Sequence, residues 1–183
     1  MGNHICPWWA GYLLANPLRR IIENPEKMIA PFVRPGMYVI DYGCGMGFFT
    51  LPLAKMVGPT GKVIAVDVQR KMLNTLRKKA HRSGLSDRVT ILAAGAEKHI
   101  KECSVDFVTA LYVIHEIVEQ HAFFEEMYRV MKPGSKILIV EPRLHVNEED
   151  FRRSIETGTS SGFVSTTGLD FPRGLRAILS KAQ

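Results

Sequence analysis

Short, mainly apolar runs alternate with stretches of helical periodicity along this chain, and this alternation constrains the fold more than any other feature. The runs that read as strands are residues 37–42, 62–67, 88–94, 106–114 and 136–142. Strands that are apolar throughout are typical of parallel sheets buried on both faces, which need a crossover helix between successive strands. The sequence therefore predicts an α/β domain with a doubly wound, mostly parallel sheet and helices on both faces.

Helical periodicity covers residues 48–57, 70–82 and 120–131. The helix over 70–82 is expected to end at Ser83 and Gly84, because glycine is favoured just past a helix. The stretch KPGS at 132–135 predicts a turn before the next strand. These helices would provide the crossovers of the sheet.

The last residues predict two more strands, 162–171 and 173–182, around a turn at Pro172. We find no repeat, linker or low-complexity tract. The chain is therefore expected to hold an N-terminal extension, residues 1–35, and one domain, residues 36–183.

Composition excludes several classes of protein. The chain has 183 residues, 46% of them hydrophobic and 23% charged, which are ordinary globular values. No apolar run reaches the length of about 18 residues that a membrane span needs. The apolar N-terminal segment has no Lys or Arg ahead of it, so it is interpreted as part of the mature protein. The odd number of cysteines, without a CxxC pair, argues against a disulfide framework and for a cytoplasmic setting: Cys6, Cys44 and Cys103.

The net charge of +6 permits an anionic partner but does not require one. The densest basic stretch is the predicted helix 70–82, in which Met72, Leu73, Leu76 and Ala80 share one stripe. We interpret its basic side as the solvated face of a surface helix.

A glycine-rich stretch, DYGCGMGFFT at 41–50, follows the first predicted strand. Ligands of such sheets bind at the carboxyl ends of the strands, where Asp41 and, after the second strand, Asp67 are expected. A carboxylate at Asp67 suits the two hydroxyls of a ribose, so a dinucleotide and an adenosyl cofactor both fit. The spacing is GxGxG, with Phe48 where the dinucleotide fingerprint has its third glycine, and this argues against a dinucleotide.

Four segments in order resemble the motifs of the class I S-adenosylmethionine-dependent methyltransferases, and within them the small-molecule, quinone-methyltransferase-like group. They are VIDYGCGMGFFTLPLA, GKVIAVDV, DFVTALYVIHEI and RVMKPGSKILIVEP, and the resemblance covers about residues 35–142. It implies S-adenosylmethionine as the cofactor. It also implies a seven-stranded Rossmann-like sheet with an antiparallel member in its last strand pair.

The resemblance implies a role for each matching residue. Asp41 would orient the glycine loop and the cofactor's amino group, Asp67 would hold the ribose hydroxyls, and Val68 would pack against the adenine. The loop glycines, Gly43, Gly45 and Gly47, would lie under the methionine part of the cofactor. Residues around Leu111 and Tyr112, in the fourth predicted strand, would close the site near the sulfonium.

One position departs from the family pattern. Relatives commonly carry an acid after the third strand that receives the adenine amino group, and here Gly95 stands in its place. The backbone of Ala96 is expected to recognise the adenine edge, or Glu97 substitutes for the missing acid. The loss of one charge-assisted hydrogen bond, about 1.5–3 kcal/mol, would weaken cofactor binding.

Several residues are candidates for the acceptor side. His115 and Glu116 follow the fourth strand, and Glu141 ends the fifth; His115 and Glu141 are each a candidate general base. The alternative is structural: His115 would satisfy a loop or a helix start, and Glu141 would bond to neighbouring backbone.

The unusual N-terminal segment adds Trp8, Trp9 and Tyr12, which would form an aromatic lid, or pack on the domain or on a second subunit in a homodimer. No His, Cys or Asp spacing suggests a metal, and an arsenic or thiol site at the cysteines is disfavoured, because Cys44 lies in the glycine loop, where it would pack.

The functional hypothesis is methyl transfer to a small-molecule acceptor. RNA is the alternative acceptor, against which stands the lack of interleaved aromatic and basic residues. A catalytically inactive S-adenosylmethionine-binding partner or sensor is the alternative from another class.

Overall fold

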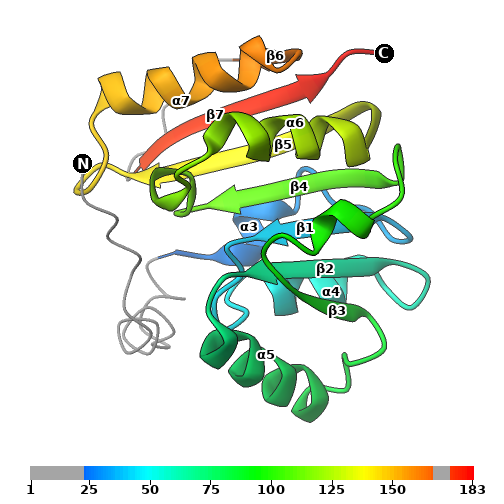
Figure 1. The fold of residues 1–183 in the computed structure, drawn as a ribbon. Coiled ribbons are helices and arrows are strands. Elements are labelled where there is room, and N and C mark those ends of the chain that lie inside the picture. Colours follow the sequence, from blue (N-terminus) through cyan, green and yellow to red (C-terminus); the bar gives the residue numbers. More distant parts are fainter. Residues whose placement is uncertain (1–22, 167–173) are drawn as a thin grey trace. The chain divides into compact units, whose positions relative to one another are not determined.

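The computed structural model describes residues 23–166 and 174–183. Its strands form a seven-stranded sheet in the order β3-β2-β1-β4-β5-β7-β6 (Figure 1). This confirms the predicted seven-stranded, mostly parallel α/β fold. The described chain divides into two compact units, with the boundary between residues 97 and 98.

The first unit is built from alternating helices and parallel strands: α3 (Pro25–Ile29), β1 (Tyr38–Tyr42), α4 (Thr50–Met56), β2 (Lys62–Asp67), α5 (Arg70–Arg82) and β3 (Val89–Ala93). Strand β1 pairs in parallel with β2, from Tyr38 opposite Lys62 onward, and β2 pairs in parallel with β3. Helix α3 begins where the Asn24 side chain accepts a hydrogen bond from the N–H of Lys27 at 3.0 Å.

Helix α5 packs the predicted apolar stripe against this part of the sheet. Its Leu73 and Leu76 form a buried cluster with Cys44 and Ala65. The helix ends as predicted, because Gly84 adopts a positive φ of 63°, a conformation that suits glycine. Residues 70–82 are therefore a helix with one buried and one basic face.

The second unit contains β4 (Val105–Leu111), the 3-10 helix η2 (Ile114–Glu116), α6 (Gln120–Val130), β5 (Met131–Pro142), α7 (Glu148–Ser160), β6 (Phe163–Thr166) and β7 (Gly174–Lys181). The 3-10 helix η1 (Glu97–His99) spans the boundary between the two units in the sequence. Strands β4 and β5 are parallel, whereas β7 is antiparallel to both β5 and β6. The two terminal strands are confirmed, and the expected turn at Pro172 lies outside the described residues.

Two local predictions in this unit are wrong. Residues 132–135 lie within β5 instead of forming a turn before it, because the strand begins at Met131 and these residues are an irregularity in its pairing with β4: Val105 faces Met131, and Phe107 next faces Lys136. Strand β4 ends at Leu111 instead of residue 114, because Tyr112 adopts a positive φ of 62° that turns the chain out of the strand.

Helix α7 was not among the predicted elements. The Asn147 side chain accepts a hydrogen bond from the Asp150 N–H at 2.8 Å, and acidic residues fill the first turn. Gly158 lets the helix lie close to β7, because a Cβ there would come within 2.5 Å of Leu179. An Asn at the cap and acidic residues in the first turn both favour the start of a helix, and both can be recognised in the sequence.

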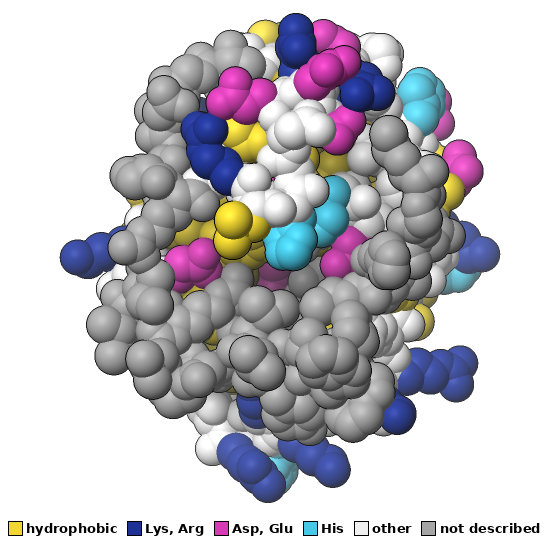
Figure 2. Space-filling view, turned by 90° about the vertical axis from the view of Figure 1, so that its left-hand side faces the viewer, with side chains coloured by type: hydrophobic (Ala, Val, Ile, Leu, Met, Phe, Trp, Pro, Cys, Tyr) yellow, Lys and Arg dark blue, Asp and Glu magenta, His cyan; other side chains and the backbone are white. Residues whose placement is uncertain are grey.

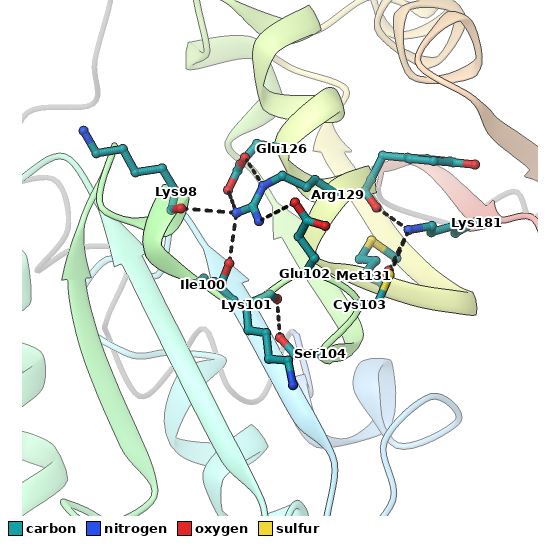
Figure 3. A network of polar contacts seen from close by, with 11 residues as sticks. Lys98, Ile100, Lys101, Glu102, Cys103, Ser104, Glu126, Arg129, Met131 and Lys181 are labelled. Atoms are coloured by element: carbon teal, nitrogen blue, oxygen red, sulfur yellow. Dashed lines mark hydrogen bonds and ion pairs between the residues drawn. The ribbon is translucent and has the colours of Figure 1, made fainter.

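A polar network ties loop 98–104 to the ends of α6 and β7 (Figure 3). Arg129 pairs with Glu126 at 2.6 Å and donates to the carbonyl of Ile100 at 3.0 Å. Lys181 donates to the carbonyls of Tyr128 at 2.7 Å and Met131 at 2.9 Å. These cations have backbone and carboxylate partners within the unit, so we interpret the network as structural.

None of the helices in residues 23–166 and 174–183 has the length and hydropathy needed to cross a membrane. The domain boundary expected near residue 35 stays a prediction, as do the roles of Trp8, Trp9 and Tyr12, which lie outside the described residues.

Candidate functional site

The loop after β1 depends on its three glycines. Gly43, Gly45 and Gly47 have positive φ angles of 73°, 52° and 89°, which L side chains rarely adopt. The N–H groups of Gly43 and Cys44 both donate to the Val66 carbonyl of β2, at 2.8 and 3.0 Å. The loop is therefore a sharply turned backbone anchored to the neighbouring strand.

Asp67, the last residue of β2, is held by backbone N–H groups on both sides. One carboxylate oxygen accepts from the Gly45 N–H at 2.9 Å and the other from the Gln69 N–H at 2.7 Å. Burial raises the pKa of this carboxyl, while the backbone hydrogen bonds oppose that rise. A carboxylate has about four lone-pair sites, more than these N–H groups and that of Val68 occupy, so it can still accept a hydrogen bond from a ligand.

Val68 follows directly and is 59% exposed. An exposed apolar side chain next to a carboxylate that can accept hydrogen bonds suits a nucleoside, whose flat base is apolar on its faces. The order acid then valine is the one that the sequence analysis singled out.

Asp41, at the end of β1, is almost completely buried, with 2% of its surface exposed. Its Oδ2 accepts a hydrogen bond from the Thr50 hydroxyl at 2.6 Å, which links the end of β1 to the start of α4. Both ends of the glycine loop are thus fixed to each other through this carboxylate.

The segment after β3 arranges its polar groups within a tight turn. Glu97 accepts from the Gly95 N–H at 2.7 Å and is 9% exposed. The Ala96 N–H, expected to recognise an adenine edge, donates to the Ala93 carbonyl at 3.1 Å. Glu97 thus places a carboxylate against the backbone of Gly95, the position at which relatives commonly carry an acid.

Tyr42 is a candidate site residue that was not predicted from the sequence. Burial, followed by the charges of Glu97 and Asp67, raises the pKa of Tyr42 to about 12. Its phenol therefore stays protonated beside two carboxylates and is a hydrogen-bond donor at any ordinary pH. Its place between Asp41 and the first glycine was the only signal available.

In the second unit, the chain leaves β4 through Leu111 and Tyr112. Leu111 is 5% exposed, and the Tyr112 N–H donates to the Val140 carbonyl of β5 at 2.7 Å. This hydrogen bond holds the strained residue at the end of the strand, just before η2.

His115 and Glu141, predicted as separate candidates, contact each other. Oε2 of Glu141 bonds to Nδ1 of His115, and Oε1 accepts from the Ile114 N–H at 2.7 Å. Glu116 lies farther away, with its Oε1 3.9 Å from Nε2 of His115. The hydrogen bond to Glu141 is the main cause that raises the pKa of His115.

The His115–Glu141 pair lies where β4 and β5 end. The arrowheads of these two strands point to the side that Figure 2 presents, where histidine side chains lie among acidic and apolar ones (Figures 1 and 2). The rings of His115 and His145 are nearly parallel, at 5°, with centroids 6.5 Å apart.

Comparison with known proteins agrees with this geometry. A family model described as a methyltransferase domain matches residues 34–165. The chain belongs to this methyltransferase domain family. A solved S-adenosylmethionine-dependent methyltransferase from Aquifex aeolicus superposes with a TM-score of 0.84 at 27% identity, covering 96% of this chain and 98% of its own.

Two quinone methyltransferases are also similar to this methyltransferase domain. The demethylmenaquinone methyltransferase of Oceanobacillus iheyensis is 33% identical over 109 residues, which are 60% of this chain and 46% of that protein. The ubiquinone/menaquinone biosynthesis C-methyltransferase UbiE of Escherichia fergusonii is 34% identical over 110 residues, 60% of this chain and 44% of that protein. The chain thus matches less than half the length of these relatives.

The predicted family, fold and cofactor, S-adenosylmethionine, are confirmed at the level of the family. The groups of the first unit fit this cofactor: a carboxylate that accepts hydrogen bonds, an exposed valine and a loop with glycines at its turns.

Burial raises the pKa of the Cys44 thiol, which packs in the core, and Cys103 is exposed. Within the described ranges, no group of His, Cys, Asp and Glu has the arrangement of a metal site.

Proposed function

We propose that this protein transfers the methyl group of S-adenosylmethionine to a small-molecule acceptor. The observation that carries the proposal is the Asp67 carboxylate, which loop N–H groups hold at the end of β2 beside the exposed Val68. The similar proteins include a demethylmenaquinone methyltransferase and an enzyme of ubiquinone and menaquinone biosynthesis, and both names denote small acceptors.

In this proposal, Asp67 accepts hydrogen bonds from the ribose hydroxyls and Val68 covers one face of the adenine. Asp41 keeps the glycine loop in place through its hydrogen bond to Thr50. Glu97 takes the adenine-side role that the family gives to the acid missing at Gly95, in preference to the Ala96 N–H, which already has a partner in the turn. Leu111 and Tyr112 line the site near the sulfonium.

When bound, S-adenosylmethionine supplies a methyl group that is already electrophilic because it is attached to a sulfonium. The protein therefore needs no nucleophile of its own, and its task is to orient the acceptor and exclude water. Orientation of this kind can contribute about 7–11 kcal/mol to lowering a barrier.

A polyanionic acceptor such as RNA is the second candidate, favoured by the basic face of α5. Arg77, Lys78, His81 and Arg82, with Ser86, line an open hollow of about 320 Å³. Phosphate contacts would make such binding fall steeply with salt concentration.

The test is transfer of a labelled methyl group from S-adenosylmethionine to naphthalene-1,4-diol and, separately, to total RNA. We expect label in the diol. Label in RNA alone would favour the second candidate, and binding of S-adenosylhomocysteine without any transfer would favour a cofactor-binding partner protein.

A matched pair of variants checks the cofactor pose. Val68 and Val164 are both 59% exposed. Val68→Ala removes two carbons, worth about 0.8 kcal/mol each, so the Kd for S-adenosylhomocysteine should rise roughly 5–15-fold. Val164→Ala should leave it unchanged, and equal effects of the two substitutions would overturn the pose.

A further inference from the structure

Glu141 is buried in a way that leaves its carboxylate fully engaged by one short segment. Its side chain is 2% exposed, and its two oxygens contact the Ile114 N–H and Nδ1 of His115. Burial of a carboxylate costs several kcal/mol unless hydrogen bonds compensate. A neutral residue could cap the Ile114 N–H at a smaller cost, so the charge has a role that capping alone does not explain.

The engagement of Nδ1 determines what the other ring nitrogen can do. A carboxylate accepts hydrogen bonds, so neutral His115 carries its proton on Nδ1 and has its lone pair on Nε2. Glu116 is 3.9 Å from Nε2, too far for a hydrogen bond. The His115 side chain is 28% exposed, so the ring is only partly buried.

The surroundings of Nε2 suit a flat, apolar molecule. The pair lies at the carboxyl ends of the parallel strands β4 and β5, the edge at which such sheets bind ligands. The His145 ring lies nearly parallel to that of His115. In the segments that follow η2 and β5, the apolar side chains of Val118 and Leu144 are 67% and 95% exposed.

We infer that His115 is the general base for an aromatic acceptor with a phenolic hydroxyl, and that Glu141 is the positioning residue that aims Nε2 at that hydroxyl. The inference rests on the proposed function and names its acceptor class. As the acceptor oxygen bonds to the methyl carbon, the bond from that carbon to the cofactor sulfur breaks and its electron pair stays on sulfur. The hydroxyl proton passes to Nε2 and then to water.

The pH dependence follows from the groups that face His115. These are Glu141 from β5, Glu116 from η2 and His145 from the segment before α7. His115 must be neutral to accept a proton, so kcat/KM should rise with pH through the pKa of His115. Glu141→Gln should move that rise to lower pH, because it removes the hydrogen bond that raises this pKa.

The kinetic test compares 4-methoxyphenol, protonated near neutral pH, with 4-nitrophenol, which is largely ionised at mildly alkaline pH. His115→Gln should reduce methylation of 4-methoxyphenol by roughly 10²–10⁴-fold and that of 4-nitrophenol by less than about tenfold, because an ionised acceptor needs no base. The control is His121→Gln, which breaks the exposed His121–Glu125 pair of α6 and should change neither rate. Equal losses on both phenols would overturn the inference.

Nitrogen NMR of histidine-labelled protein tests the pair without any acceptor. We expect neutral His115 with its proton on Nδ1, and loss of that preference in Glu141→Gln. A proton on Nε2 in the unaltered protein would overturn the inference. If the protein binds S-adenosylhomocysteine but methylates neither phenol, the acceptor class is wrong; if it does not bind S-adenosylhomocysteine, the proposed function itself fails.

Discussion

The two halves of the described chain present their functional groups by different means. In residues 23–97, one carboxylate, Asp67, is held by backbone N–H groups of a glycine loop and of its own turn. In residues 98–183, two side chains, His115 and Glu141, hold each other. The first site depends on glycines, which allow the backbone of the loop to turn. The second depends on two side chains, which can be substituted without changing the backbone. Substitutions of the loop glycines should therefore affect folding most, whereas substitutions of the His115–Glu141 pair should affect chemistry most.

The electrostatics of the two sites differ in the same way. Burial raises the pKa of Asp67, so its ionised form opposes folding as the pH rises above about 3.8. The hydrogen bond to Glu141 raises the pKa of His115, so its protonated form favours folding. The first site holds a charge at a cost to stability, and the second stabilises one.

The largest effect is expected from Gly47→Ala. A Cβ at this position would lie 2.5 Å from the Leu76 side chain, and φ is +89°. Left-handed strain of about 1–2 kcal/mol and overpacking of about 1–3 kcal/mol should lower the unfolding free energy by about 2–5 kcal/mol. The melting temperature should fall by roughly 4–20 °C in calorimetry.

The matched control for this substitution is Gly58→Ala. Gly58 has a similar φ of +68° but nothing within 4 Å of the added Cβ. Only the left-handed strain of about 1–2 kcal/mol applies. If both variants melt at the same temperature, the close approach of Gly47 to Leu76 contributes nothing to the effect of Gly47→Ala.

A smaller loss of stability is expected from Arg129→Met. This substitution tests whether the Arg129 network, unlike the His115–Glu141 pair, supports the fold without taking part in methyl transfer. Arg129 binds Glu126 and the Ile100 carbonyl (Figure 3). Because its side chain is 31% exposed, we expect a loss of only about 1–2 kcal/mol in urea unfolding, with methyl transfer per folded molecule unchanged. A fall in kcat/KM at unchanged stability would contradict the division into structural and functional clusters.

The smallest effect concerns pH. The pKa of His115 is raised on folding, so its contribution to stability is complete below about pH 6.5 and is lost as the pH rises through the folded-state pKa. The unfolding free energy of the unaltered protein minus that of His115→Gln should therefore be larger at acidic than at alkaline pH. A constant difference would show that Glu141 does not stabilise the imidazolium.

Features encoded by neighbouring residues could be predicted from the sequence. The acid at the end of β2 and the glycines after β1 are local signals, and the apolar stripe of α5 is periodic. The missed helix α7 also has local signals in Asn147 and the acids after it. It was missed because Phe151 and Ile155 are its only large apolar residues, so the stretch lacks the longer apolar stripe that identified α5.

Contacts between distant residues could not be predicted in this way. His115 and Glu141 are 26 residues apart, and their contact depends on the pairing of β4 with β5, in which Leu111 faces Val140. The irregularity at 132–135 is part of this pairing, and its Pro and Gly were interpreted as a turn. The environment of Tyr42 likewise depends on acids from two other segments, Asp67 and Glu97.

Calorimetric titration of the protein with S-adenosylhomocysteine and with NADH, repeated on Asp67→Asn, tests the central claim most directly. We predict that S-adenosylhomocysteine binds, that NADH does not, and that Asp67→Asn weakens binding roughly 10–150-fold, because charge-assisted hydrogen bonds worth about 1.5–3 kcal/mol are lost. Binding of NADH alone, or equal affinity of the unaltered protein and Asp67→Asn for S-adenosylhomocysteine, would contradict the account.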